Sequence, residues 1–258
     1  MIFNPENDER QLIHTRTGEP YQPVRLYFQL FNRKTVEGVF KKLRCVQPGL
    51  NADHWQWLYD QEIKKLRFDV SYNKLPKDYR PLVLADIFFR DDKMLMDLRS
   101  FQRASYAADF FHKRINPHAA CLTHARIVNR FFDGTVEKRE KIAPPFDQFF
   151  EREDVYIPDM EAMDQKLAEI TEQFEDVEER SAAFTEYLDA QANQKLPEIE
   201  QLPIHVYEDK TAVGFNLALM LRHVEASQHW MGNTSFTQRD AIDLLTQGMG
   251  DDLEEFED

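Results

Sequence analysis

The sequence has few of the residues from which common catalytic sites are built. Its 258 residues include 8 glycines and 2 cysteines. A phosphate-binding loop needs several glycines in a short span, and the chain has no such span. No Gly-x-Ser-x-Gly motif marks a nucleophilic serine, and Cys45 and Cys121 are too few for a disulfide framework. These absences argue against a nucleotide-binding loop, a serine hydrolase and a disulfide-stapled secreted domain.

Long apolar runs are missing as well. The first 20 residues are polar and charged, unlike a secretory signal, and no apolar run reaches the roughly 20 residues that span a bilayer. We therefore expect a soluble, cytoplasmic protein without a membrane partner. A chain of this length can bury a full core and can form one large domain or two smaller ones.

Charge divides the chain into two parts of opposite sign. Residues 1–145 carry 25 Lys and Arg against 18 Asp and Glu, a net charge of +7, whereas residues 146–258 carry 7 against 28, a net charge of −21. Either the two parts dock on each other or the basic part meets an acidic partner. The predicted divisions are a basic α+β domain (1–140), a linker (141–158), an acidic helical region (159–248) and an acidic tail (249–258).

The clearest local pattern is a β-hairpin over residues 80–100. Two apolar, β-favouring runs flank Asp91 and Asp92, which suit a two-residue turn. This register places Asp86 directly opposite Asp97. Because like charges opposite each other destabilise a sheet by about 0.2–1 kcal/mol, the register requires a cation beside these carboxylates.

This acidic pair, Asp86 and Asp97, is the first candidate site. Two carboxylates on one sheet face can hold Mg²⁺ or share a proton in acid–base catalysis. Ordinary ion pairing with neighbouring Lys and Arg side chains is the interpretation that we favour.

The remaining pattern predicts an α+β fold, with a small antiparallel or mixed sheet and packed helices. Apolar residues recur at steps of three and four over 159–192, which predicts one long helix of coiled-coil type, able to pair with another helix or to form a homo-oligomer through 159–190. Strands are also expected over 11–15 and 24–31, and helices over 35–43, 51–68, 100–115, 117–132 (with a strand as the alternative), 211–224 and from Ser235 onward.

Three residues come closest to a metal-binding motif: His118, Cys121 and His124. At about 100° per residue on a helix the three side chains do not converge, and on a strand Cys121 points away from both histidines. Zinc sites generally have two short ligand pairs, so we favour ordinary structural roles for these residues and expect no cofactor.

A basic surface with aromatic residues is the third candidate site. Cations can follow a phosphate backbone and aromatic rings can stack on bases. Trp57 lies off the apolar stripe of its predicted helix, so it is either offered to a partner or covered by another element, and we favour the second. The residues of this surface are Trp57, Lys41, Lys42, Arg44, Lys64, Lys65 and Arg67.

Taken together, these patterns favour a non-enzymatic protein-interaction module, which would be an adaptor, assembly factor or regulatory factor. The divided charge, the long helical stripe, the 20 phenylalanines and the lack of a catalytic motif support this hypothesis. The first alternative is an RNA- or DNA-binding protein that uses the basic domain. The second is a metal-dependent enzyme built on Asp86 and Asp97 or on His118, Cys121 and His124.

Overall fold

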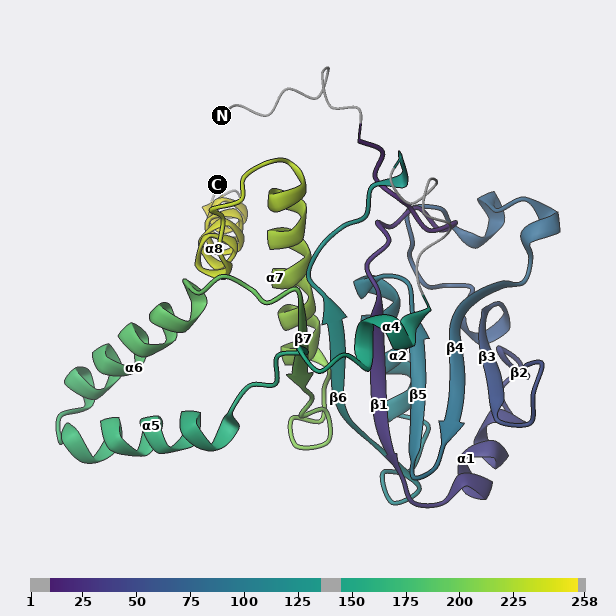
Figure 1. The fold of residues 1–258 in the computed structure, drawn as a ribbon, viewed down its shortest axis with the longest axis horizontal. Coiled ribbons are helices and arrows are strands. Elements are labelled where there is room, and N and C mark those ends of the chain that lie inside the picture. Colours follow the sequence, from purple (N-terminus) through teal and green to yellow (C-terminus); the bar gives the residue numbers. More distant parts are fainter. Residues whose placement is uncertain (1–9, 136–144, 255–258) are drawn as a thin grey trace.

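The fold is built on one antiparallel sheet of seven strands, in the order β2-β3-β4-β5-β1-β6-β7 (Figure 1). The structure is a computed structural model that describes residues 10–135 and 145–254, with side chains described up to residue 246. This sheet and the helices packed on it confirm the predicted α+β fold. The strands are β1 (Val24–Leu30), β2 (Val46–Pro48), β3 (His54–Tyr59), β4 (Leu82–Arg90), β5 (Lys93–Leu98), β6 (Ala120–Val128) and β7 (Ile199–Pro203).

Helices lie on both faces of the sheet (Figure 1). Three of them, α1, α2 and α7, contribute to the core on what we call the inner face, whereas α4 lies on the opposite, outer face. Within the described ranges no helix is both long and apolar enough to cross a membrane. The helices are α1 (Arg33–Phe40), α2 (Phe101–His112), α4 (Phe146–Phe150), α5 (Met160–Gln173), α6 (Val177–Ala192), α7 (Val213–Trp230) and α8 (Gln238–Glu254), with short 3-10 helices η2 (Gln61–Ile63), η3 (Tyr72–Lys74) and η4 (Lys77–Tyr79).

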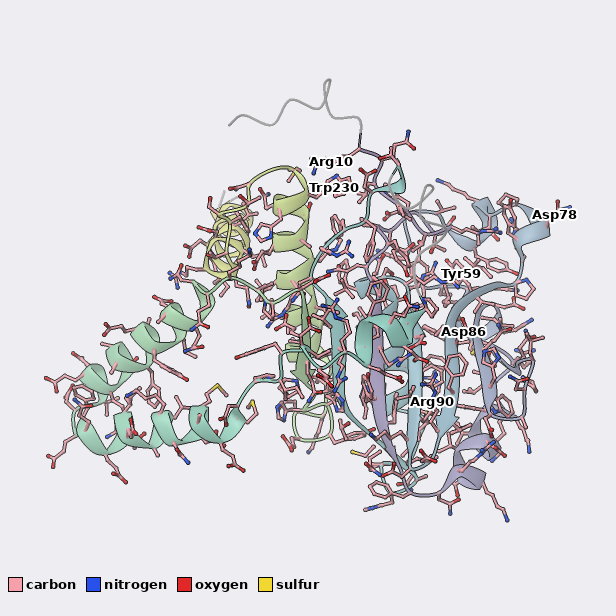
Figure 2. All side chains as sticks on the ribbon, in the orientation of Figure 1. Arg10, Tyr59, Asp78, Asp86, Arg90 and Trp230 are labelled. Carbon is pink, nitrogen blue, oxygen red and sulfur yellow. The ribbon has the colours of Figure 1, made fainter. Side chains whose placement is uncertain are left out.

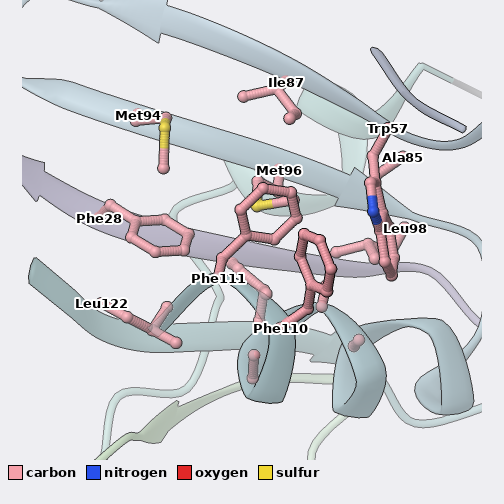
Figure 3. Close-up of a cluster of buried hydrophobic side chains, with 14 of the residues drawn as sticks. Phe28, Trp57, Ala85, Ile87, Met94, Met96, Leu98, Phe110, Phe111 and Leu122 are labelled. Atoms are coloured by element: carbon pink, nitrogen blue, oxygen red, sulfur yellow. The ribbon is translucent and has the colours of Figure 1, made fainter. Parts of the chain in front are cut away.

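The main core lies between the inner face and α2 (Figure 3). Alternate residues of β1, among them Leu26 and Phe28, point into this core because side chains alternate between the two faces of a strand. From α2, Phe110 and Phe111 meet them, with ring centroids 5.0 Å apart. Burying one such side chain contributes about 1.5–3 kcal/mol, so this layer supplies much of the stability.

The predicted hairpin is confirmed, including its register. Strands β4 and β5 pair Phe89 with Met94, Ile87 with Met96 and Asp86 with Asp97. The first turn residue, Asp91, has a φ of 50°, in the left-handed region that short polar residues tolerate best after glycine. The hairpin therefore brings two carboxylates together on the outer face.

Two of the predicted helices are strands. Residues 54–59 form β3, within the helix predicted over 51–68, and residues 120–128 form β6, the strand alternative to the helix over 117–132. In β3 the buried residues Trp55 and Trp57 alternate with more polar neighbours, which is a strand period that the helical stripe obscured. The strand predicted over 11–15 makes only isolated bridges, such as that between His14 and Pro20.

The single long helix predicted over 159–192 is also wrong, because the chain breaks between α5 and α6. Phe174 has φ −117° and ψ 116°, an extended conformation that ends α5. Asp176 then begins α6, since its carboxylate accepts hydrogen bonds from the backbone N–H groups of Glu178 (2.9 Å) and Glu179 (3.1 Å). The two helices fold back on each other as a hairpin that projects from the sheet (Figure 1).

Side-chain caps set the start of two other helices. Ser100 begins α2 as predicted, because its hydroxyl accepts a hydrogen bond from the backbone N–H of Arg103 (3.2 Å). Helix α8 begins two residues later than the predicted Ser235 cap would place it. The N-cap is Thr237 instead, and Asp240 accepts a hydrogen bond from the Thr237 backbone N–H (2.8 Å). Thr237 and Asp240 thus form the capping box that was predicted for Ser235 and Gln238.

The sheet crosses the boundary predicted at residue 140, because β7 pairs with β6. Between these strands, residues 157–198 leave the sheet and return to the same point; we call this segment the arm. Its base is closed by the Tyr156 N–H, which donates to Ile199 O (3.0 Å), and by the Gln201 N–H, which donates to Tyr156 O (2.8 Å). The predicted linker contributes α4, while residues 136–144 lie outside the described residues.

A buried carboxyl group lies in α7, close to α8. Glu225 is 1% exposed, and the nearest imidazole nitrogen, His229 Nε2, lies 3.7 Å from its Oε1. Burial raises the pKa of Glu225 to about 7, and the nearby Arg222 opposes this only in part. Between its ordinary pKa of 4.5 and about 7, the folded chain therefore holds a proton at Glu225 that the unfolded chain has lost.

We expect Glu225→Gln to change the pH dependence of stability. As pH rises from about 4.5 to about 7, the wild-type free energy of unfolding falls, because only the unfolded state ionises this group readily. At pH 8 the variant should be more stable than the wild type by about 1–3 kcal/mol, and at pH 4 the two should be equal. Urea denaturation at both pH values measures this, and an equal difference at pH 4 and pH 8 would contradict it.

Candidate functional site

A row of polar side chains crosses the outer face of the sheet, one from each strand. Cross-strand pairing links each member to the next, so all of them point to the same side of the sheet. A polar row through the middle of a sheet whose two faces both carry core residues calls for a specific explanation. From β2 to β7 the polar row contains Gln47, Gln56, Asp86, Asp97, Arg25, Arg126 and Gln201.

Arg25 is the centre of the polar row. It is 1% exposed, and its Nε and Nη2 donate to the two carboxylate oxygens of Asp97 over 2.6 and 2.9 Å. Nη2 also donates to Asp147 of α4 (2.7 Å), which in turn accepts from Arg90. Burial raises the pKa of Asp97, and the Arg25 guanidinium opposes this shift. The cation that the hairpin register required is therefore Arg25, from a different strand.

Asp86 has its own partners. His54 Nε2 lies 2.9 Å from Asp86 Oδ1, and Gln56 Nε2 donates to the same oxygen over 3.1 Å. The other ring nitrogen of His54, Nδ1, accepts from the backbone N–H of Leu50 (3.3 Å), so the proton must be on Nε2, which donates to Asp86. Both imidazole nitrogens are thus occupied, and His54 orients Asp86.

A cavity of about 490 Å³ lies beside Asp86, next to the residues that precede β4. Asp78 and Asp86, both labelled in Figure 2, are among the residues that line it. Its walls carry acids, among them Asp78, and bases, among them Arg16 and Arg99. The Arg16 guanidinium lies 3.8 Å from the centroid of the Tyr79 ring. Such a mixed-charge lining suits a small polar molecule, and none of the described residues that line it is arranged as a nucleophile with its base.

The predicted metal ligands do not assemble into a site. His118 is exposed in the turn before β6, while Cys121 and His124 lie on β6 itself. The His124 ring stacks on Tyr27 with centroids 4.4 Å apart, and burial together with Arg126 and Lys93 lowers its pKa to about 4. Within the residues that the structure describes, no group of three or more His, Cys, Asp or Glu side chains could hold a metal ion.

In the predicted aromatic and basic surface, the basic residues are exposed but the aromatic residue, Trp57, is buried. Trp57 is 0% exposed and packs against Phe110 and Phe111, with centroids 5.7 and 5.6 Å away, which confirms that it is covered. The cations are exposed on two neighbouring loops, joined by Glu62, which accepts hydrogen bonds from the backbone N–H groups of Arg44 and Cys45. We call these cations the basic edge; they are Lys41, Lys42, Arg44, Lys64, Lys65 and Arg67.

The arm carries the strongest charge of the described surface. Residues 159–192 contain eleven acidic and two basic residues. Helix α6 has no buried residue, and its apolar side chains Val177 and Leu188 are 73% and 55% exposed. A shallow, open groove of about 790 Å³ runs along α6 and is lined by residues of that helix alone: Val177, Glu178, Ser181, Ala182, Thr185, Glu186 and Asp189.

Residues of the outer face that the sequence did not single out are Arg25, Arg90 and Asp147. One signal was present: Arg25 is the only charged residue in the β-favouring run Val24–Phe31. A charge inside an apolar strand needs a buried partner. Which carboxylates supply that partner depends on contacts between residues 72 and 122 positions apart, which the sequence pattern does not encode.

No protein-family model matches the chain, and comparison with curated proteins and with solved structures finds no match for it.

Substitution at the two paired carboxylates should have unequal effects. Asp97→Asn leaves the buried Arg25 without its main counter-charge, so we expect a loss of about 3 kcal/mol in the free energy of unfolding. Asp86→Asn keeps an acceptor for Gln56 and removes a like charge, so the change should be under about 1 kcal/mol. Urea denaturation of both variants at pH 7 measures this, and equal losses would refute the separate roles.

Proposed function

We propose that this protein is a protein-interaction module whose acidic arm binds a basic, amphipathic segment of a partner protein. The observation that carries the proposal is one face of α6, where the exposed apolar side chain of Val177 lines a groove together with the acidic side chains of Glu178, Glu186 and Asp189. A helix that is packed only against its own protein would normally turn such apolar side chains inward.

The position of the arm supports this proposal. The arm projects beyond β7 and covers neither face of the sheet (Figure 1). Its base is fixed by the backbone bonds of Tyr156 and by the ion pair between Asp189 and Arg239 of α8. The outer part of α6, with Val177 and Ser181, is therefore accessible to another molecule, while the contacts at the base hold the arm in position.

The chemistry of the groove indicates a partner of basic, amphipathic character. Val177 supplies an apolar contact at one end of the groove, Glu178 and Glu186 line it with negative charge, and the exposed Leu188 lies on the same helix outside the lining. A segment with an apolar stripe and flanking Lys or Arg residues complements both features. The charges would speed association, and the apolar contacts would hold the complex.

Nucleic-acid binding has weaker support. The indole that would stack on a base, Trp57, is buried, and two cations of the basic edge are already paired, Lys64 with Asp60 (2.9 Å) and Arg44 with Glu62 (3.7 Å). The basic edge lies at the opposite end of the sheet from the arm (Figure 1). It could also be what the arm binds, in a second copy of this chain.

Charge reversal on α6 should abolish binding of a basic helix. The probe is a synthetic amphipathic Leu/Lys peptide of about 16 residues, the length of α6, titrated into the full chain by calorimetry. We expect Glu178→Lys/Glu186→Lys to weaken binding at least tenfold, because the change turns attraction at the groove into repulsion. The matched control is Asp164→Lys/Glu172→Lys on α5, with the same spacing and charge change outside the groove.

Comparison with the Asp164→Lys/Glu172→Lys control shows whether the peptide binds at the groove or responds only to net charge. If both double variants weaken binding equally, the peptide senses only net charge and the proposed groove is wrong. If the wild-type chain instead forms dimers that Glu178→Lys/Glu186→Lys dissociates, the occupant is a second copy of the chain and the partner-protein proposal fails. Sedimentation of the wild-type chain and of both double variants distinguishes these outcomes.

The contribution of the exposed apolar side chains of α6 to peptide binding can be tested separately. Val177→Ser/Leu188→Ser removes two exposed apolar side chains without changing charge, so folding should be unaffected while peptide affinity falls about tenfold. Leu50→Ser is the control, since Leu50 is 95% exposed at the far end of the sheet. Peptide titration and thermal denaturation measure both effects, and unchanged affinity in the double variant would show that the groove makes no apolar contact.

A further inference from the structure

A second concave site lies on the outer face, beside the end of α4. It is a notch of about 270 Å³ between α4, the β4–β5 turn and β6, separate from the cavity at Asp86 and from the arm. Its lining comes from strands far apart in the sequence and includes four cations. The four cations are Arg25, Arg90, Lys93 and Arg126, and they lie among three carboxylates, Asp91, Asp92 and Glu151, with Tyr27, Leu95 and Phe150 completing the lining.

The notch contains an unpaired donor on a buried charged group. Arg25 donates through Nε and Nη2, but its Nη1 has no hydrogen-bond partner among the described residues although the side chain is 1% exposed. The nearest carboxylate oxygen, Glu151 Oε1, is 3.7 Å away, beyond hydrogen-bond distance, and Arg90 holds Glu151 at 2.8 Å. Because buried guanidinium N–H groups are nearly always paired, this atom indicates a missing acceptor.

Two further cations converge on the same space. Arg126 approaches from β6, with Nε donating to Gln201 (3.2 Å) and Nη1 to the backbone oxygen of Phe150. Lys93 approaches from β5 and has no ion-pair partner within the described residues. Four cations against three carboxylates leave the lining with a small excess of positive charge, and Arg126 and Lys93, after burial, also lower the pKa of the neighbouring His124.

We propose that this notch binds a small oxyanion of the phosphate class. A tetrahedral anion can accept from several directions at once, and the donors here arrive from β1, β5 and β6 around the floor made by Tyr27. One oxygen would accept from Arg25 Nη1, and the others would face Arg126 and Lys93. The notch is larger than a bare phosphate and open on one side, so it leaves room for a substituent on the anion.

The test is a titration of the full chain with inorganic phosphate at low ionic strength, followed by NMR shifts of the Arg and Tyr27 signals. We expect saturable binding that Arg126→Gln and Lys93→Gln each weaken about tenfold, since each removes one charge-assisted hydrogen bond. Lys41→Gln on the basic edge is the control for a general loss of positive charge, and it should leave the affinity unchanged.

Glu151→Gln provides a sharper discrimination. If Glu151 competes with the anion for Arg25, this variant should bind phosphate at least threefold more tightly. Weaker or absent binding in the variant would overturn the proposal, because removing a negative charge beside the notch should favour an anion bound there. Acetate that binds as tightly as phosphate, or phosphate that does not saturate in the wild type, would overturn it as well.

Discussion

The structure depends on one buried charge in the middle of its sheet. Arg25 lies in a central strand with an apolar core below it, and an unpaired guanidinium there would be too costly to bury. Asp97 supplies the counter-charge from β5, and Asp147 supplies a second from α4. The position of α4 is thus fixed by this ion pair together with its buried phenylalanines, Phe149 and Phe150, and α4 covers part of the outer face of the sheet.

The divided charge of the chain corresponds to a division in space. The basic edge and the acidic arm lie at opposite ends of the sheet (Figure 1), so the two parts do not neutralise each other within one molecule. The sheet therefore carries charge of opposite sign at its two ends, an arrangement that orients a protein in the field of another charged molecule. Its small cavities lie between these ends, on the outer face.

Local patterns predicted the structure well where contacts between neighbours in sequence decide it. The β4–β5 hairpin, β1 and the Ser100 cap of α2 follow from residues within a few positions. The patterns failed for β3 and left β6 undecided between helix and strand, because the same apolar residues fit either period and pairing with distant strands decided the outcome. Asp176 is a residue type that commonly begins a helix, but the apolar stripe continues past it without a break and therefore favoured one long helix. The partners of Arg25 depend on tertiary contacts alone.

The arm leaves and rejoins the sheet at one point, where Tyr156 and Ile199 are hydrogen-bonded. In topological terms it is an insertion into the connection between two adjacent strands, and the sheet's pairing does not pass through it. Loss or exchange of the arm would therefore leave the seven-stranded scaffold and its polar row intact, because loop length between fixed ends has only a small effect on stability. The binding function that we propose for the arm is thus separable from the fold that carries it.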